Sequence, residues 1–118
     1  MKIAISVQYG EDLKAPMDPR FGRCGVFLVV DDANGEILKM IPNKNYDAAH
    51  GAGVGATALV AEAGVKGVIS GRFGPKAMMG LEAKGIHMYS APEGITAGEA
   101  LERMKKGELV QEKMREFR

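Results

Sequence analysis

Residues 50–77 read HGAGVGATALVAEAGVKGVISGRFGPKA: a glycine-rich loop, an alanine-rich stretch, a β-branched run and a second glycine turn. The alanine-rich stretch 54–63 stops at Gly64, as a helix stops at a C-terminal glycine. The run 65–70 is typical of a strand. Pro75 suits the first position of a second helix. This succession of helix, strand and helix predicts an α/β fold.

The flanking sequence supplies the remaining elements. Two strand-like runs are separated by Asn34-Gly35, a strong hairpin signal, so we expect them to pair antiparallel. Thr96 and Glu99 form a capping-box pattern that begins a last helix. The predicted elements are strands 2–8, 26–31 and 36–41, helix 54–63, strand 65–70, helix 75–84, strand 86–90 and helix 97–106. This order, β-β-β-α-β-α-β-α, predicts a three-layer α/β/α arrangement around a mixed five-stranded sheet whose second strand is antiparallel.

Length and composition limit the classes of function. The 118 residues, 46% of them apolar, predict a single domain over 1–118. Sixteen basic and fifteen acidic residues leave a net charge of +1, which excludes binding of nucleic acid or an anionic membrane through bulk charge. The charged C-terminal tail 108–118 contains apolar residues at spacings that allow a further turn of helix.

The N-terminus and the cysteine content point to the cytoplasm. Cys24 is the single cysteine, so no intramolecular disulfide can form. Met1 leads directly into a short apolar run without a signal-peptide pattern. No apolar run approaches the roughly 20 residues that cross a bilayer. We therefore expect a cytoplasmic protein without a membrane segment.

Three glycine-rich loops follow the strands that run in the same direction. Because the carboxyl ends of such strands share one edge of a sheet, and ligands bind there in open α/β sheets, we expect a site at this edge. Arginines beside the thiol of Cys24 would favour its thiolate and capture an oxyanion. The glycines before each helix expose backbone N–H groups to an anion, and His50 adds an imidazole that could ligate a metal. The candidate residues are Arg20, Arg23 and Cys24 in the first loop, His50, Gly51, Gly53 and Gly55 in the second, and Gly71, Arg72 and Gly74 in the third.

Each of these residues also has a structural interpretation. A lone cysteine such as Cys24 is more often a buried apolar side chain than a ligand. His50 can cap the helix or its loop, and Arg20 and Arg23 can be ordinary surface ion-pair partners. The glycine pattern lacks the spacing of a dinucleotide fingerprint and is not a P-loop, so a nucleotide is not expected. No carboxylate pair or Ser/His/Asp arrangement indicates catalysis.

Four motifs in order give the chain a resemblance to a known family. These motifs are DPRFGRC (18–24), FLVVD (27–31), the segment 50–77 and GITAGEALERMKKGEL (94–109). Together they resemble the dinitrogenase iron-molybdenum cofactor biosynthesis family, in its small, standalone, nitrogenase accessory factor-like form. The resemblance implies a ribonuclease H-like fold without the metal-binding carboxylates of ribonuclease H enzymes.

The resemblance also implies a function. It implies binding or carriage of an iron-sulfur or iron-molybdenum type cofactor, or its precursor, without turnover, and cofactor donor or acceptor proteins as partners. The positions that match the family pattern are Arg20, Phe21, Gly22, Arg23, Cys24, His50, Gly51, Gly53, Gly55, Gly71 and Gly74.

The residues restrict how such a cofactor could be held. A cluster built from free iron normally needs about four protein thiolates, and this chain has one. A preassembled cluster brings its own sulfides and negative charge, so Cys24, His50, arginines and helix N-termini could hold it reversibly. Two chains could also share a cluster through paired Cys24 residues, so we expect a monomer or a weak homodimer. The alternative functions are a metal-free module that binds a small oxyanion or phosphate and, ranked last, a hydrolase.

Overall fold

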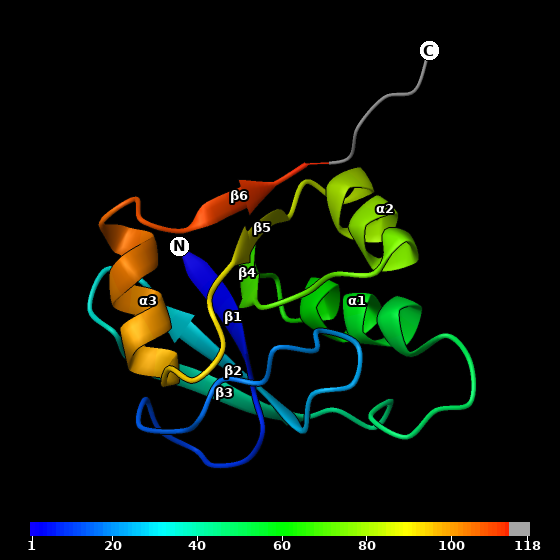
Figure 1. Cartoon of the computed structure of the whole chain (residues 1–118), viewed down its shortest axis with the longest axis horizontal. Helices are drawn as coiled ribbons and strands as arrows, with labels where there is room; N and C mark the ends of the chain where they lie inside the picture. The colour runs from blue at the N-terminus through cyan, green and yellow to red at the C-terminus, as the bar shows by residue number, and fades with distance from the viewer. Residues whose placement is uncertain (114–118) are drawn as a thin grey trace.

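The computed structural model describes residues 1–113, which form a mixed α/β fold with a six-stranded sheet and three helices (Figure 1). The sheet order is β3-β2-β1-β4-β5-β6. In chain order the elements are β1 (Lys2–Val7), β2 (Val26–Asp31), β3 (Ile37–Pro42), α1 (Ala52–Glu62), β4 (Gly67–Ser70), α2 (Pro75–Ala83), β5 (His87–Ser90), α3 (Ala97–Lys105) and β6 (Val110–Glu112).

Strand directions follow from the connections between the strands. The helical crossover through α2 makes β4 and β5 parallel, and β1 is also parallel to β4. The hairpin turn after β2 has Gly35 at φ 74°, and the Gly35 N–H donates to the Asp31 carbonyl oxygen at 2.8 Å. β2 is therefore antiparallel to both β1 and β3, which confirms the prediction for the second strand.

The prediction of five strands is wrong, because the sheet contains a sixth. β6 pairs antiparallel with β5, and the Ser90 hydroxyl donates to Glu112 Oε1 at 2.9 Å. The helix expected in the tail 108–118 is not seen at residues 110–112, because these residues satisfy backbone groups along the outer edge of β5 instead. Residues 114–118 of that tail lie outside the described residues. The ribonuclease H-like assignment stays a prediction.

The core lies on both faces of the sheet. On one face, Ile3 and Ile5 of β1 pack with Leu101 and the alanines of α3. On the other face, Val68 of β4 packs with Val60 of α1 and with residues of α2. The helices are therefore divided between the two faces, with α3 on one and α1 and α2 on the other, as Figure 1 shows. Within residues 1–113, no helix has the length and apolar character needed to cross a membrane.

The first loop is attached to the rest of the fold through Pro16, Met17 and Arg20. Isolated β-bridges join Val7 to Met17, Pro16 to Thr96 and Arg20 to Arg72. The last of these bridges is parallel, so it extends the pairing direction of β1 and β4 beyond the strands themselves. The loop therefore presents residues 20–23 at a fixed place beside the segment that follows β4.

Candidate functional site

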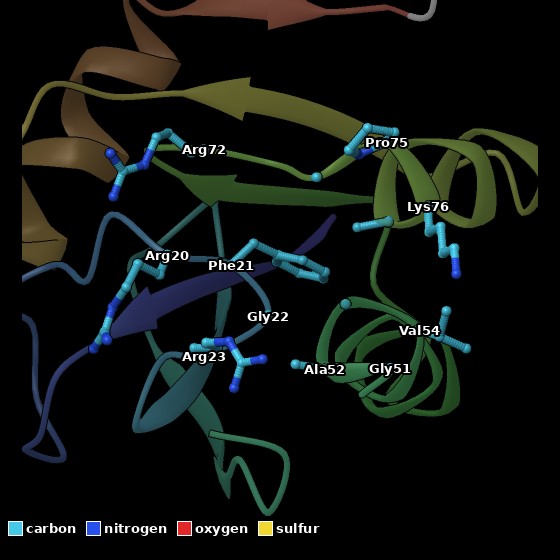
Figure 2. Close-up of a pocket in the computed structure, with 13 residues that line it drawn as sticks. Arg20, Phe21, Gly22, Arg23, Gly51, Ala52, Val54, Arg72, Pro75 and Lys76 are labelled. Carbon is cyan, nitrogen blue, oxygen red and sulfur yellow. The ribbon is translucent and has the colours of Figure 1, made fainter. Parts of the chain in front are cut away.

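A pocket of about 510 Å³ lies where the first loop meets the starts of α1 and α2 (Figure 2). All three loops that follow the carboxyl ends of β1, β3 and β4 contribute to it. The lining residues are Arg20, Phe21, Gly22, Arg23, Gly51, Ala52, Gly53, Val54, Arg72, Gly74, Pro75, Lys76 and Ala77. The pocket therefore occupies the edge at which open α/β sheets bind ligands.

Two helix N-termini border the pocket. α1 follows Gly51, whose φ of 73° favours glycine, and α2 follows Gly74 with Pro75 in its first turn. In neither helix does a side chain cap the first turn. The N–H groups of these first turns, apart from the proline, therefore have no cap within their own helix, and together with the helix dipoles they favour negative charge in the pocket.

Glycines allow the backbones around the pocket to approach closely. A Cβ at position 22 would lie 2.9 Å from the Gly53 nitrogen, and a Cβ at position 53 would lie 3.2 Å from the Ala77 Cβ. These two contacts bring the first loop, α1 and α2 together. A Cβ at Gly71 would lie 2.7 Å from the Pro19 Cα, so Gly71 supports the first loop without lining the pocket.

Phe21 fixes the first loop to the core beneath the pocket. Its side chain is buried, and its ring centroid lies 5.4 Å from that of Phe27 and 5.3 Å from that of Phe73. Its backbone N–H donates to the Arg72 carbonyl oxygen at 3.2 Å. An aromatic side chain held in this way gives the pocket an apolar base between charged walls.

Every charged side chain among the described lining residues is basic. Figure 2 shows Arg20, Arg23 and Arg72 coming from the first loop and the segment after β4, whereas Lys76 comes from the start of α2. The β-bridge between Arg20 and Arg72 pairs the backbones of two of these basic residues. The pocket is therefore suited to an anion.

Two of the four cations already have partners in the protein. The Arg20 Nε and Nη2 atoms donate to the two carboxylate oxygens of Asp18, each at 3.1 Å, and this hydrogen bonding raises the pKa of Arg20. The Arg23 Nη1 atom donates to the carbonyl oxygens of Ala48 at 2.8 Å and Tyr46 at 3.4 Å. Arg20 is thus an ion-pair partner as well as a lining residue.

Cys24 lies beside the pocket but does not line it. Its side chain is fully buried in the cluster that contains Phe21 and Phe27. Burial, assisted by the negative charge of Asp18, raises the pKa of the Cys24 thiol to about 12. The prediction that arginines favour the thiolate is therefore wrong, because burial outweighs the effect of Arg20. The role of Cys24 as a metal ligand stays a prediction.

His50 and Gly55 also lie outside the pocket lining. His50 is exposed next to Gly51, and it does not cap α1. Gly55 is in contact with the side chain of Asn45. Across residues 1–113, no three His, Cys, Asp or Glu side chains are grouped so as to hold a metal ion. Of the predicted site residues, the structure brings together Arg20, Phe21, Gly22, Arg23, Gly51, Gly53, Arg72 and Gly74, but not Cys24, His50, Gly55 and Gly71.

Sequence reasoning missed two polar residues of the site. Lys76 follows Pro75 in the first turn of α2, so the helix-start signal could have identified it. Asn43 is buried, and its Nδ2 donates to the carbonyl oxygens of Gly22 at 3.0 Å and Cys24 at 2.9 Å. Nothing in the sequence around Asn43 indicates that it crosses to the first loop.

Comparison with known proteins assigns the chain to a family. The family model described as "Dinitrogenase iron-molybdenum cofactor" matches residues 1–107. The chain belongs to this family. Among solved structures, the apo form of the orange protein from Desulfovibrio gigas is similar to it, with 34% identity and a TM-score of 0.87 over 94% of this chain and 92% of the other.

Two further proteins are similar to this chain. An NMR structure from Thermotoga, provisionally assigned as a NifB protein, is 29% identical with a TM-score of 0.79 and covers 93% of this chain and 91% of its own. An uncharacterized protein of Methanocaldococcus jannaschii is 36% identical over 93 residues, 77% of this chain and 75% of the relative. Membership of the dinitrogenase iron-molybdenum cofactor family suggests a cofactor-related binding role.

Proposed function

We propose that this chain binds a preassembled, anionic iron-sulfur or iron-molybdenum type cofactor, or its precursor, in the pocket of Figure 2 and releases it without chemical turnover. The supporting observation has two parts. Among the described residues that line the pocket, the charged ones are Arg20, Arg23, Arg72 and Lys76, and two helices without side-chain caps begin at its border. Both features favour an anion. Family membership indicates which anion to test first.

The donor set fits a cluster that carries its own sulfide ligands. Assembly from free iron would need several thiolates, and Cys24, the one cysteine, is buried and holds its proton. Arginine and backbone N–H groups can instead donate hydrogen bonds to the sulfides of a finished cluster. The proposal therefore assigns the holding of the cargo to N–H donors, with Cys24 and His50 as additional ligands to be tested.

The size and exposure of the pocket fit reversible carriage. Its volume of about 510 Å³ lies within the roughly 300–1,000 Å³ typical of small-ligand sites. The Arg20 side chain is 56% exposed, so solvent screens its charge and keeps the overall affinity for an anion below that of a buried site. Modest affinity allows release to an acceptor protein. Cofactor donor and acceptor proteins, and a cytoplasmic location, form part of the proposal.

Anaerobic titration with a synthetic iron-sulfur cluster, followed by visible absorption, tests the proposal. We expect the wild-type protein to bind and the Arg20→Gln/Arg72→Gln variant to lose most of its affinity. The matched control, Lys39→Gln/Lys105→Gln, removes two charges from exposed positions outside the pocket lining and should bind like the wild type. Equal binding by all three proteins would contradict the proposal.

A separate variant addresses the two residues predicted as ligands. If Cys24→Ala/His50→Ala binds the cluster as tightly as the wild type, neither residue is a ligand and the N–H donors alone hold the cargo. A loss of affinity in this variant, together with a changed absorption spectrum, would assign direct ligation.

A second candidate is a metal-free module that binds phosphate or another small oxyanion. The observation that favours it is the same set of N–H donors, because guanidinium forks and helix N-termini also bind phosphate. Calorimetry of the metal-free protein with phosphate and with molybdate distinguishes the two. Absence of heat with both oxyanions would remove this candidate.

A further inference from the structure

Asp18 is a buried carboxylate that pairs with Arg20, a lining residue of the pocket. It is 1% exposed and is the one charged side chain that is buried within residues 1–113. Its backbone N–H donates to the Ser6 carbonyl oxygen at 2.9 Å, and its own carbonyl oxygen accepts from the Ser6 hydroxyl at 2.6 Å. These two hydrogen bonds attach Asp18 to Ser6, near the end of β1.

Arg20 supplies three hydrogen bonds to the Asp18 carboxylate. The Arg20 backbone N–H donates to Oδ1 at 2.9 Å, Nε donates to the same oxygen at 3.1 Å, and Nη2 donates to Oδ2 at 3.1 Å. This two-point pairing fixes the plane of the guanidinium, which a single contact would not do. The Nη1 donors and the second hydrogen of Nη2 lie on the opposite edge of Arg20, away from the paired oxygens.

Arg20 also has a fixed neighbour. The parallel bridge sets the backbone of Arg72 beside that of Arg20, and the Arg72 N–H donates to the Pro19 carbonyl oxygen at 2.6 Å. Both arginines line the pocket. The backbone pairing thus fixes the Cα positions of both arginines, and the Asp18 carboxylate fixes the position of the Arg20 guanidinium.

We propose that Asp18 is the positioning residue of the anion site: it orients Arg20 beside Arg72 so that the two guanidinium groups bind one anion together. This inference rests on the proposed function. Preorganisation raises affinity because the side-chain freedom of Arg20 is lost before the ligand arrives.

Charge alone predicts the opposite effect of removing the carboxylate. Asp18→Asn deletes a negative charge next to the pocket, which by Coulomb attraction should strengthen the binding of an anion. The substituted amide retains an oxygen for the Arg20 backbone N–H but places an N–H₂ donor where Nη2 needs an acceptor. If Asp18 orients Arg20, the variant should therefore bind a synthetic iron-sulfur cluster roughly tenfold more weakly than the wild type.

Arg20→Lys shows whether the effect passes through Arg20, because lysine keeps the charge without the paired fork. In that background we expect Asp18→Asn to leave affinity unchanged or to raise it. The matched control is Asp12→Asn, since Asp12 Oδ1 also accepts a backbone N–H two residues on, from Lys14 at 2.9 Å, but lies outside the pocket. It should bind like the wild type. Two outcomes would overturn the inference. One is that Asp18→Asn weakens binding equally in the wild-type and the Arg20→Lys backgrounds; the other is that the Asp18→Asn variant binds as tightly as the wild type.

A measurement on the wild type keeps the test independent of variant folding. In ¹⁵N NMR spectra the Arg20 Nε–H should give a signal protected from exchange with water that shifts when the cluster is added. An unprotected or unshifted Arg20 signal in a protein that binds the cluster would overturn the inference while leaving the proposed function standing. A wild-type protein that binds no cluster would overturn both.

Discussion

The backbone of Gly22 lies so close to that of Gly53 that a Cβ at position 22 would come within 2.9 Å of the Gly53 nitrogen. This contact joins the first loop to the start of α1 and closes one wall of the pocket. The obstructing atoms belong to the backbone of the first turn of α1, which cannot move without disturbing the helix. The identity of residue 22 is therefore set by the space between two chain segments.

Gly22→Ala should destabilise the protein and widen the pocket. We expect a loss of about 1–3 kcal/mol in the free energy of unfolding, because the added methyl group forces the loop and α1 apart. Gly74→Ala is the control, since Gly74 also lines the pocket but has open space around it and a φ of −69°. Urea denaturation should show a change smaller than about 1 kcal/mol for the control. Similar losses in the two variants would contradict the packing argument.

The thiol of Cys24 should be unreactive in the folded protein at pH 8. Burial raises its pKa to about 12, so almost no thiolate forms, and a disulfide reagent cannot reach the sulfur. The reagent should react after the protein is unfolded in urea, and the absorbance of the thiolate that the reagent releases measures the reaction. Rapid reaction in the absence of urea would show that the side chain opens to solvent.

The same pKa shift predicts a pH dependence of stability. Because the folded value lies above the unfolded value of 9.0, the native state keeps a proton that the unfolded state loses, and stability falls as pH rises from 9.0 to about 12. The stability difference between wild type and Cys24→Ala should therefore shrink across this window. A stability difference that stays constant across this window would contradict the raised pKa of Cys24.

The elements that were predicted correctly have local signals. The hairpin at Asn34-Gly35, the proline at the start of α2 and the capping box of Thr96 and Glu99 all act within a few residues of the element they define. β6 has no such signal. Its three residues become a strand because β5 offers an unpaired edge, which is a property of the tertiary structure.

The features of the candidate site also divide into those with a signal in the sequence and those that depend on tertiary packing. The loops that border the pocket could be predicted because strands of one direction end at one edge of the sheet. The burial of Cys24 could not, because it depends on the packing of Phe21 and Phe27. Neither could the pairing of Arg20 with Asp18, which requires the Asp18 carboxylate of the first loop to be buried.

Asn43→Ala should destabilise the connection between the two loops beside the pocket. The Asn43 side chain donates to the carbonyl oxygens of Gly22 and Cys24, and its Oδ1 accepts from the Asn45 N–H at 3.1 Å. Removing it leaves buried backbone groups unsatisfied, which costs about 1–3 kcal/mol. Asn34→Ala, which removes one exposed turn hydrogen bond to the Glu36 N–H, is the control and should cost less. Thermal unfolding measures both, and equal costs would mean that water replaces Asn43.

Arg23→Gln should release the loop that leads into α1. Arg23 Nη1 donates to the carbonyl oxygens of Ala48 and Tyr46, so this lining residue of the pocket anchors the loop that leads into α1 to the first loop. Without the Arg23 anchor, we expect chymotrypsin to cleave after the exposed Tyr46 several-fold faster, because local opening of the loop limits cleavage. Tyr9 is equally available in the first loop and serves as the internal control, since its cleavage rate should not change. Mass spectrometry of the fragments separates the two sites, and faster cleavage at both would indicate global destabilisation instead of the loss of one anchor.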